Sequence, residues 1–155
     1  MIDHKNPPFG DPDNTRDYQS PISPRILVVD DDSGIRRLSA LALSQSGYTV
    51  DAAEDGAVAW QALHANRYDL MITDNRMPKV TGIELLRKLR ATRMALPVIL
   101  ATGILPAWEL AQNPWLLPDA TLMKPFSVDE LLATVKSVFH AHAVVRRQSA
   151  PSKYQ

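Results

Sequence analysis

Cysteine is absent from this chain of 155 residues. Its absence excludes disulfide bonds, catalysis by a thiol and zinc sites built on cysteine, and it fits a protein of the reducing cytoplasm. An excess of charge of either sign is also absent, because lysine plus arginine and aspartate plus glutamate each number 17. This balance gives no electrostatic reason to expect nucleic acid or an acidic membrane surface as a partner.

Long hydrophobic runs are missing as well. The N-terminal segment MIDHKNPPFGDP contains no apolar stretch of the kind found in secretory signals. The most apolar segment, residues 95–108, is interrupted by Pro97, Gly103 and Pro106, which leaves it too short to span a membrane. We therefore expect a cytoplasmic protein that does not enter the membrane.

Composition and pattern divide the chain into three parts. Residues 1–24 are rich in proline, aspartate and asparagine and have no periodicity, so we expect a disordered arm. Residues 25–142 carry the regular patterns of one compact domain, and residues 143–155 form a short polar tail. A DNA-binding helix-turn-helix would need a longer segment than this tail, so we expect a single domain without direct contact to nucleic acid.

Within residues 25–142, short apolar runs alternate with segments whose apolar residues recur at helical spacing. The predicted strands are residues 26–29, 48–50, 70–73, 97–100 and 120–123. The predicted helices are residues 33–46, 55–65, 83–89, 107–112 and 127–142, and the fourth is short because prolines confine it. This alternation predicts an α/β fold with a parallel sheet, right-handed crossovers and helices on both faces.

The pattern also predicts details of individual helices. Ser33 and Ser127 stand where N-caps are expected, just before apolar residues begin to recur. In the second helix, the spacing of Val58, Ala59 and Leu63 predicts that these side chains face the core. The first helix is marked by apolar residues at helical spacing, namely Ile35, Leu38, Leu41 and Ala42.

Carboxylates follow two of the predicted strands at the point where each strand ends. Asp30, Asp31 and Asp32 come after the first strand, and Asp74 comes after the third. Because these strands are neighbours in a doubly wound sheet, their carboxyl ends can converge. Clustered carboxylates raise one another's pKa unless a cation lies among them, and hard oxygen ligands suit Mg²⁺. One aspartate alone, Asp32 above all, would more simply cap a helix, but the set with Asp74 favours a metal site.

Two other strand ends add a hydroxyl and a cation. Thr102 follows the fourth strand, and Lys124 follows the fifth and precedes Pro125. Each would ordinarily be a solvated turn residue. Together with the aspartates they supply what phosphoryl transfer needs, namely a nucleophile, a metal site, a cation and a hydroxyl donor.

Four segments, in this order, resemble the receiver domain of two-component response regulators. They read ILVVDDDSGIRRL, DLMITDNRMPKVTGIELLRKLR, PVILATG and LMKPF, and the resemblance extends over residues 25–142. It implies a flavodoxin-like, doubly wound sheet of five parallel strands in the order 2-1-3-4-5. It also implies phosphorelay signalling, with a phosphoryl group accepted from a histidine kinase or a histidine phosphotransfer protein.

The resemblance assigns roles to the residues at the strand ends. Asp74 would be the phosphoacceptor and a ligand of Mg²⁺, together with Asp31 and the backbone carbonyl of Arg76, while Asp30 would bind the metal through water. Thr102 would sense the phosphoryl group and Lys124 would pair with it. The bond from Lys124 to Pro125 would be cis.

The sequence departs from the receiver pattern on its output side. Receivers usually carry tyrosine or phenylalanine three residues before the conserved lysine, and here that residue is Thr121. A switch that turns an aromatic ring inward at this position is therefore not available. Trp108 and Trp115, in the irregular segment nearby, either replace that ring or simply cover the core. Thr81 replaces the usual aspartate before Gly82 and can still cap the third helix.

Three functions remain open from the sequence. The first is a switching receiver, a monomer or weak homodimer with an unknown output protein and no enzymatic activity beyond self-directed phosphoryl transfer and slow autodephosphorylation. The second is a docking module that no longer switches, which Thr121 favours. The third is a Mg²⁺-dependent phosphohydrolase with an aspartate nucleophile, because Asp30 and Asp32 have the spacing of its nucleophile and acid-base pair. The order of the motifs favours the first.

Overall fold

The computed structural model describes residues 22–148, so the arm expected over residues 1–24 lies almost wholly outside the described residues. The strands are β1 (Arg25–Val29), β2 (Thr49–Ala53), β3 (Leu70–Thr73), β4 (Val98–Thr102) and β5 (Ala120–Met123). The helices are α1 (Ser33–Gln45), α2 (Gly56–Ala65), α3 (Gly82–Ala91), α4 (Ala107–Gln112), the 3₁₀ helix η1 (Pro114–Leu116) and α5 (Val128–Gln148). Strands and helices alternate along the chain, as the sequence predicts.

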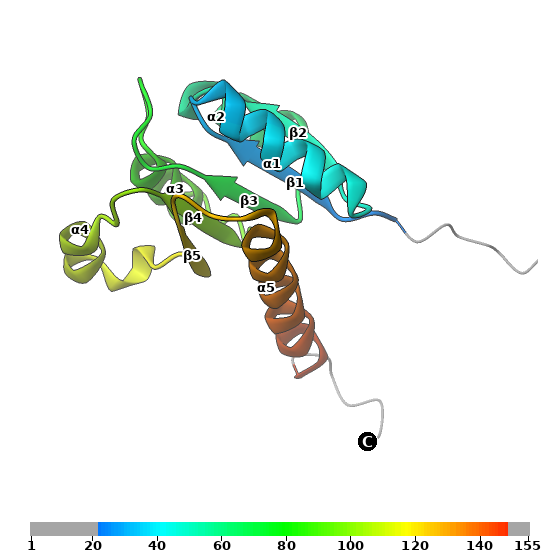
Figure 1. Ribbon diagram of the computed structural model, residues 1–155. Helices are drawn as coiled ribbons and strands as arrows, with labels where there is room; N and C mark the ends of the chain where they lie inside the picture. Colours follow the sequence, from blue (N-terminus) through cyan, green and yellow to red (C-terminus); the bar gives the residue numbers. More distant parts are fainter. Residues whose placement is uncertain (1–21, 149–155) are drawn as a thin grey trace, which may run out of the picture.

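The five strands form one parallel sheet in the order β2-β1-β3-β4-β5 (Figure 1). β1 lies between β2 and β3, with Ile26 paired to Val50 on one side and to Leu70 on the other. The central strands β1, β3 and β4 are buried along almost their whole length, as expected of strands covered on both faces. The predicted flavodoxin-like topology is confirmed.

Helices cover both faces of the sheet, and alternate residues of each strand point to opposite faces. Ile26 and Val28 of β1 pack in the core beneath α1 and α5, which lie on the near side of the sheet in Figure 1. Leu27 and Val29 pack in the second core, beneath α2, α3 and η1. No helix within residues 22–148 is long and apolar enough to cross a membrane.

Polar side chains mark where three helices begin. Asp32, and not Ser33, is the N-cap of α1, because its carboxylate accepts a hydrogen bond of 2.9 Å from the backbone N–H of Ile35. The prediction of Ser33 as the cap is wrong by one residue. Thr81 caps α3 in a reciprocal capping box, and Ser127 exchanges equivalent hydrogen bonds with Glu130, so these two predicted caps are confirmed.

Three element predictions need correction. Val58 is 36% exposed, so the inward face of α2 consists of Ala59 and Leu63, and Val58 lies at its rim. The second strand continues to Ala53, because pairing with β1 extends to the end of that strand. The last helix does not end near His142 but continues to Gln148, and His142 contacts Asp119 with 2.8 Å between Nε2 and Oδ1. This contact ties the later turns of α5 to the loop before β5.

The short α4 is confirmed, but neither tryptophan beside it covers the core. Trp108 is 73% exposed and Trp115 is 55% exposed, so this alternative is wrong. Leu110 of α4 and Leu116 of η1 are buried in their place. The Arg87 guanidinium lies 5.8 Å from the centre of the Trp115 ring, which leaves that ring at the surface against α3.

Candidate functional site

The carboxyl ends of β1 and β3 bring three of the predicted carboxylates together. Val29 and Thr73 are paired in the sheet, and the N–H of Asp74 donates to the carbonyl of Val29 at 3.0 Å. Asp30 and Asp74 therefore leave neighbouring strands at the same level. Carboxylate oxygens of Asp30, Asp31 and Asp74 all lie within 4.8 Å of one another. The predicted convergence is present in the fold.

Lys124 reaches this cluster from the end of β5. Its Nζ lies 2.6 Å from Oδ2 of Asp30 and 2.9 Å from Oδ2 of Asp74. The peptide bond that follows, to Pro125, is cis as expected. All three side chains are largely shielded from solvent, and charged hydrogen bonds of this length are among the stronger ones. Lys124 therefore joins the two buried carboxylates.

Burial and charge act in opposite directions on this cluster. Burial raises the pKa of Asp30 above its ordinary value, and hydrogen bonds from Lys124 and from the N–H of Asp32 offset only part of that rise. Burial acts to lower the pKa of Lys124, but its hydrogen bonds with Asp30 and Asp74 outweigh burial, so its pKa is raised. Lys124 is thus held in its charged form at neutral pH.

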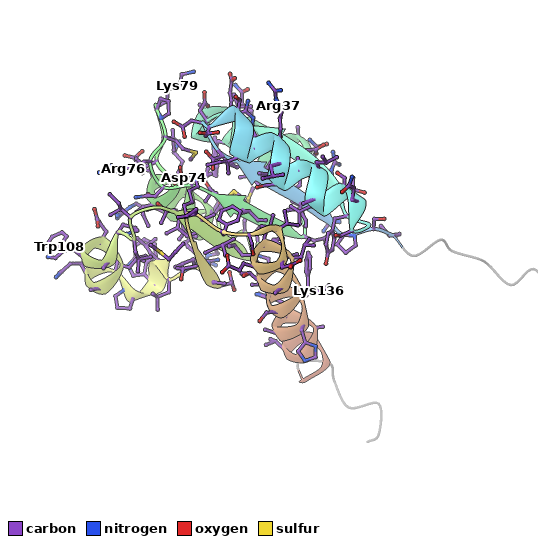
Figure 2. All side chains as sticks on the ribbon, viewed as in Figure 1. Arg37, Asp74, Arg76, Lys79, Trp108 and Lys136 are labelled. Atoms are coloured by element: carbon purple, nitrogen blue, oxygen red, sulfur yellow. The ribbon has the colours of Figure 1, made fainter. Side chains whose placement is uncertain are left out.

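The donor set fits a hard divalent cation. Three carboxylates face one ammonium group, so negative charge remains in excess at the strand ends. Asp30 and Asp74 are buried, whereas Asp31 is exposed and leaves the outer side of the cluster open to water. Mg²⁺ prefers oxygen ligands and keeps several waters, which this arrangement allows. Arg76 follows in the same loop as Asp74 (Figure 2), and the role of its carbonyl as a ligand stays a prediction.

Thr102 lies beside this cluster, but its hydroxyl group is directed elsewhere. The N–H of Lys124 donates to the carbonyl of Thr102 at 3.0 Å, which places the ends of β4 and β5 together. Thr102 is almost completely buried, and its hydroxyl donates to the carbonyl of Ile104 at 3.2 Å, within the loop that leads to α4. Thr121 is exposed on β5, opposite Leu100. Thr102 therefore connects the site to the loop before α4.

Asn75, directly after Asp74, and Gly82, the first residue of α3, have contacts that the sequence did not predict. The carbonyl of Asn75 accepts from Gly82 N–H, and its side-chain Oδ1 accepts from Ile83 N–H, both at 3.0 Å. Gly82 lies so close to Asp74 that a Cβ atom there would overlap the carbonyl oxygen of Asp74. A polar residue directly after Asp74 and a glycine at the start of α3 are visible in the sequence, but their contacts are not.

An apolar groove opens next to Lys124. It has a volume of about 300 Å³ and lies between α1 and the segment that joins β5 to α5. Its lining residues are Ile35, Leu38, Ser39, Lys124, Pro125 and Phe126. Leu38, which lines this groove, is 56% exposed, and Leu41, about one turn further along α1, is 57% exposed. Oδ1 of Asp32, which caps α1, accepts from the N–H of Ile35 there.

Known proteins are similar to this chain both in sequence and in fold. The model of the response regulator receiver domain matches residues 26–136. Response regulator MprA of Mycobacterium ulcerans (strain Agy99) is 35% identical over 131 residues, which are 84% of this chain and 56% of that protein. Response regulator MprA of Mycobacterium sp. (strain KMS) is 38% identical over 114 residues, or 74% of this chain and 50% of the relative. The chain thus spans about half the length of the curated relatives it matches.

Solved structures give the same result. The receiver domain of the Francisella response regulator 1452 superposes with a TM-score of 0.70 at 31% identity, covering 77% of this chain and 99% of the other. Response regulator protein TrrA from Thermotoga maritima, solved in complex with Mg²⁺-BeF, gives a TM-score of 0.66 at 35% identity, covering 74% and 98%. This chain belongs to the family of response regulator receiver domains of two-component signalling systems.

Proposed function

We propose that this receiver domain accepts a phosphoryl group on Asp74 from the phosphohistidine of a kinase or phosphotransfer protein, and that the modification switches a surface for an output protein. The observation that carries the proposal is the environment of Asp74, whose buried carboxylate contacts Lys124 beside Asp30 and Asp31. The complex of the similar regulator TrrA with Mg²⁺-BeF supports a site of this chemistry. We expect only self-directed phosphoryl transfer, without turnover of an external substrate.

The transfer step uses one oxygen of the Asp74 carboxylate. That oxygen forms a bond to phosphorus while the phosphorus–nitrogen bond to the donor histidine breaks. The imidazole leaves with the bonding electron pair and takes a proton from water. Mg²⁺, held by Asp31 and Asp74 with Asp30 behind them, would supply positive charge to the phosphoryl oxygens during this step. The product is an acyl phosphate on Asp74.

Lys124 and Thr102 respond to the new group. Formation of the acyl phosphate moves the negative charge from the Asp74 carboxylate to the phosphoryl oxygens, so the ammonium of Lys124 turns toward a phosphoryl oxygen and keeps its contact with Asp30. The hydroxyl of Thr102 donates to a phosphoryl oxygen only after it releases the carbonyl of Ile104. That release frees the loop before α4, where the exposed Trp108 lies at the outer margin of the molecule (Figure 2). The signal therefore reaches α4 without an aromatic ring at Thr121.

The apolar face of α1 is the surface on which we place the donor protein. Leu38 and Leu41 project outward from α1, and Phe126 lines the groove that leads to Lys124. A protein that presents a phosphohistidine to Asp74 must cover this end of the sheet. Exposed apolar side chains at that rim supply the buried contact area that such a complex needs.

The substitution Leu38→Glu is expected to weaken binding of the donor protein without changing the reaction at Asp74. A buried charge in the contact should slow phosphoryl transfer from a phosphorylated histidine kinase at least tenfold, because an unpaired charge in an interface costs on the order of 2 kcal/mol. Transfer from phosphoramidate should be unchanged, since Asp74 and Lys124 are untouched. The kinase of the source organism that phosphorylates the parent chain fastest is the protein donor for every variant. Leu117→Glu is the matched control, because Leu117 is 57% exposed, close to the 56% of Leu38, but lies after η1.

If Leu38→Glu and Leu117→Glu slow phosphoryl transfer from the kinase equally, α1 is not the docking surface. Slowing with phosphoramidate as well would show that the substitution damages the site itself.

Mg²⁺ is expected to stabilise the folded domain. The metal binds the converged carboxylates of the native state and not the unfolded chain, so a hundredfold excess over its dissociation constant adds about 2.7 kcal/mol. The thermal midpoint of the parent chain should therefore rise by several degrees across a Mg²⁺ titration. Asp31→Ala should abolish the rise, while Asp129→Ala, which removes an exposed carboxylate from α5, should not. A flat titration of the parent chain would contradict the metal site.

A docking module that does not switch is the second function to test. The exposed Thr121 favours it, because the usual aromatic is missing there. Beryllofluoride with Mg²⁺ separates the two functions. Binding accompanied by changes in Trp108 fluorescence and in the amide signals of residues 103–120 supports switching, whereas binding without either change supports the docking module.

A further inference from the structure

Three polar groups of Asn75 form hydrogen bonds within the site. Its N–H donates to Oδ1 of Asp74 at 2.7 Å, while Oδ2 of Asp74 accepts from Lys124 at 2.9 Å. Its carbonyl and its side-chain oxygen accept the N–H groups of Gly82 and Ile83 at 3.0 Å each. The side chain is partly buried, so these bonds are only in part exposed to water. One residue therefore joins the Asp74 carboxylate to the first turn of α3.

Helix α3, to which Asn75 is hydrogen-bonded, is firmly packed against the core. Leu85, Leu86 and Leu89 of α3 are fully buried in the core beneath the sheet. Thr81 and Glu84 form the capping box of this helix, so Asn75 is not needed to cap it. The first turn of α3 still has N–H groups without helical partners, and Asn75 uses two of them to hold its own position.

We propose that Asn75 is a positioning residue for phosphoryl transfer: it fixes the rotamer of the Asp74 carboxylate by anchoring the following peptide to α3. The backbone N–H of Asn75 holds Oδ1, and this leaves Oδ2 on the side of Lys124. A nucleophile that is misplaced by about 1 Å can lose on the order of a hundredfold in rate. The inference rests on the proposed phosphorylation of Asp74 and concerns how fast that reaction proceeds.

The test compares four variants with the parent chain at saturating Mg²⁺ and at a temperature where each is folded. Asn75→Ala removes the acceptor for Ile83 N–H and should slow labelling by acetyl phosphate at least tenfold. Asn75→Gln keeps the amide but displaces it by one methylene, and it should slow labelling in the same way. Asn75→Asp keeps an acceptor oxygen at the same distance and should restore most of the rate. Asn66→Ala, which removes an asparagine at the end of α2, is the control and should label at the parental rate.

The outcomes distinguish positioning from a purely structural role. A structural role lowers the thermal midpoint of Asn75→Ala but leaves the rate of the folded protein unchanged, and that result would overturn the inference. Equal rates for Asn75→Ala and Asn75→Asp would overturn it too, because the acceptor oxygen would then be irrelevant. If Asn75→Ala does not fold, the rate of Asn75→Gln decides. A parent chain that takes no label at all would overturn the proposed function together with this inference, whereas a labelled parent with fast Asn75 variants would overturn the inference alone.

Discussion

Asp74→Asn should abolish labelling of the chain by acetyl phosphate. An amide is a far poorer nucleophile than a carboxylate, so the expected loss exceeds a thousandfold, which corresponds to about 4 kcal/mol of activation free energy. The substitution is nearly isosteric, and Lys124 keeps its contact of 2.6 Å with Asp30, so the variant should remain folded. Intact-protein mass spectrometry measures the label directly.

The control for this experiment is Asp129→Asn, which removes a carboxylate in the first turn of α5 and should label at the parental rate. Undiminished labelling of Asp74→Asn would move the nucleophile to Asp30 or Asp32 and revive the phosphohydrolase alternative. In the structure, Asp30 accepts from Lys124 and from the N–H of Asp32, and the carboxylate of Asp32 caps α1.

The architecture could be predicted because it depends on patterns that are local in the sequence. Strands buried on both faces appear as continuous apolar runs, and helices appear as recurring apolar positions. Once the strands were placed, the rule that ligands gather beyond the carboxyl ends of parallel strands brought Asp30, Asp74 and Lys124 to one edge. The observed contacts of Lys124 with both aspartates agree with that reasoning.

The errors arose where tertiary packing decides between equivalent local choices. Asp32 and Ser33 are both good caps, and the geometry of the turn after β1 selects Asp32. Helical spacing identified Leu38 and Leu41 as a stripe, but only the fold shows that α1 buries Ala42 and Leu43 and leaves this stripe exposed. This exposed stripe is the surface on which we place the donor protein.

The close approach of α3 to Asp74 could not be predicted at all. Gly82 reads as an ordinary glycine near the start of a helix, and Asn75 reads as a turn residue. Their importance follows from two backbone segments that meet only in the folded chain. A Cβ atom on Gly82 would overlap the carbonyl oxygen of Asp74 and lie 2.9 Å from Cα of Asn75. These are main-chain atoms, which cannot rotate away as a side chain can.

Gly82→Ala should therefore disturb both the fold and the chemistry. Overpacking of this kind costs about 1–3 kcal/mol, and the better helix propensity of alanine returns at most about 1 kcal/mol. The thermal midpoint should fall by several degrees. In the fraction that remains folded, α3 or the loop must shift, and Asn75 moves with it. Labelling of Asp74 by acetyl phosphate should then slow by about a hundredfold.

Gly103→Ala is the matched control for stability, because Gly103 also lies next to the site but a Cβ there would meet nothing within 4 Å. Its thermal midpoint should be unchanged or slightly higher, since alanine restricts the unfolded chain. Both variants exchange glycine for alanine in loops or helix ends at the same edge of the sheet, so a difference between them isolates the contact with Asp74. Equal thermal midpoints for the two variants would mean that α3 can shift without loss of stability. Labelling of Gly82→Ala at the parental rate would show that the position of Asp74 does not depend on the close packing of α3 against it.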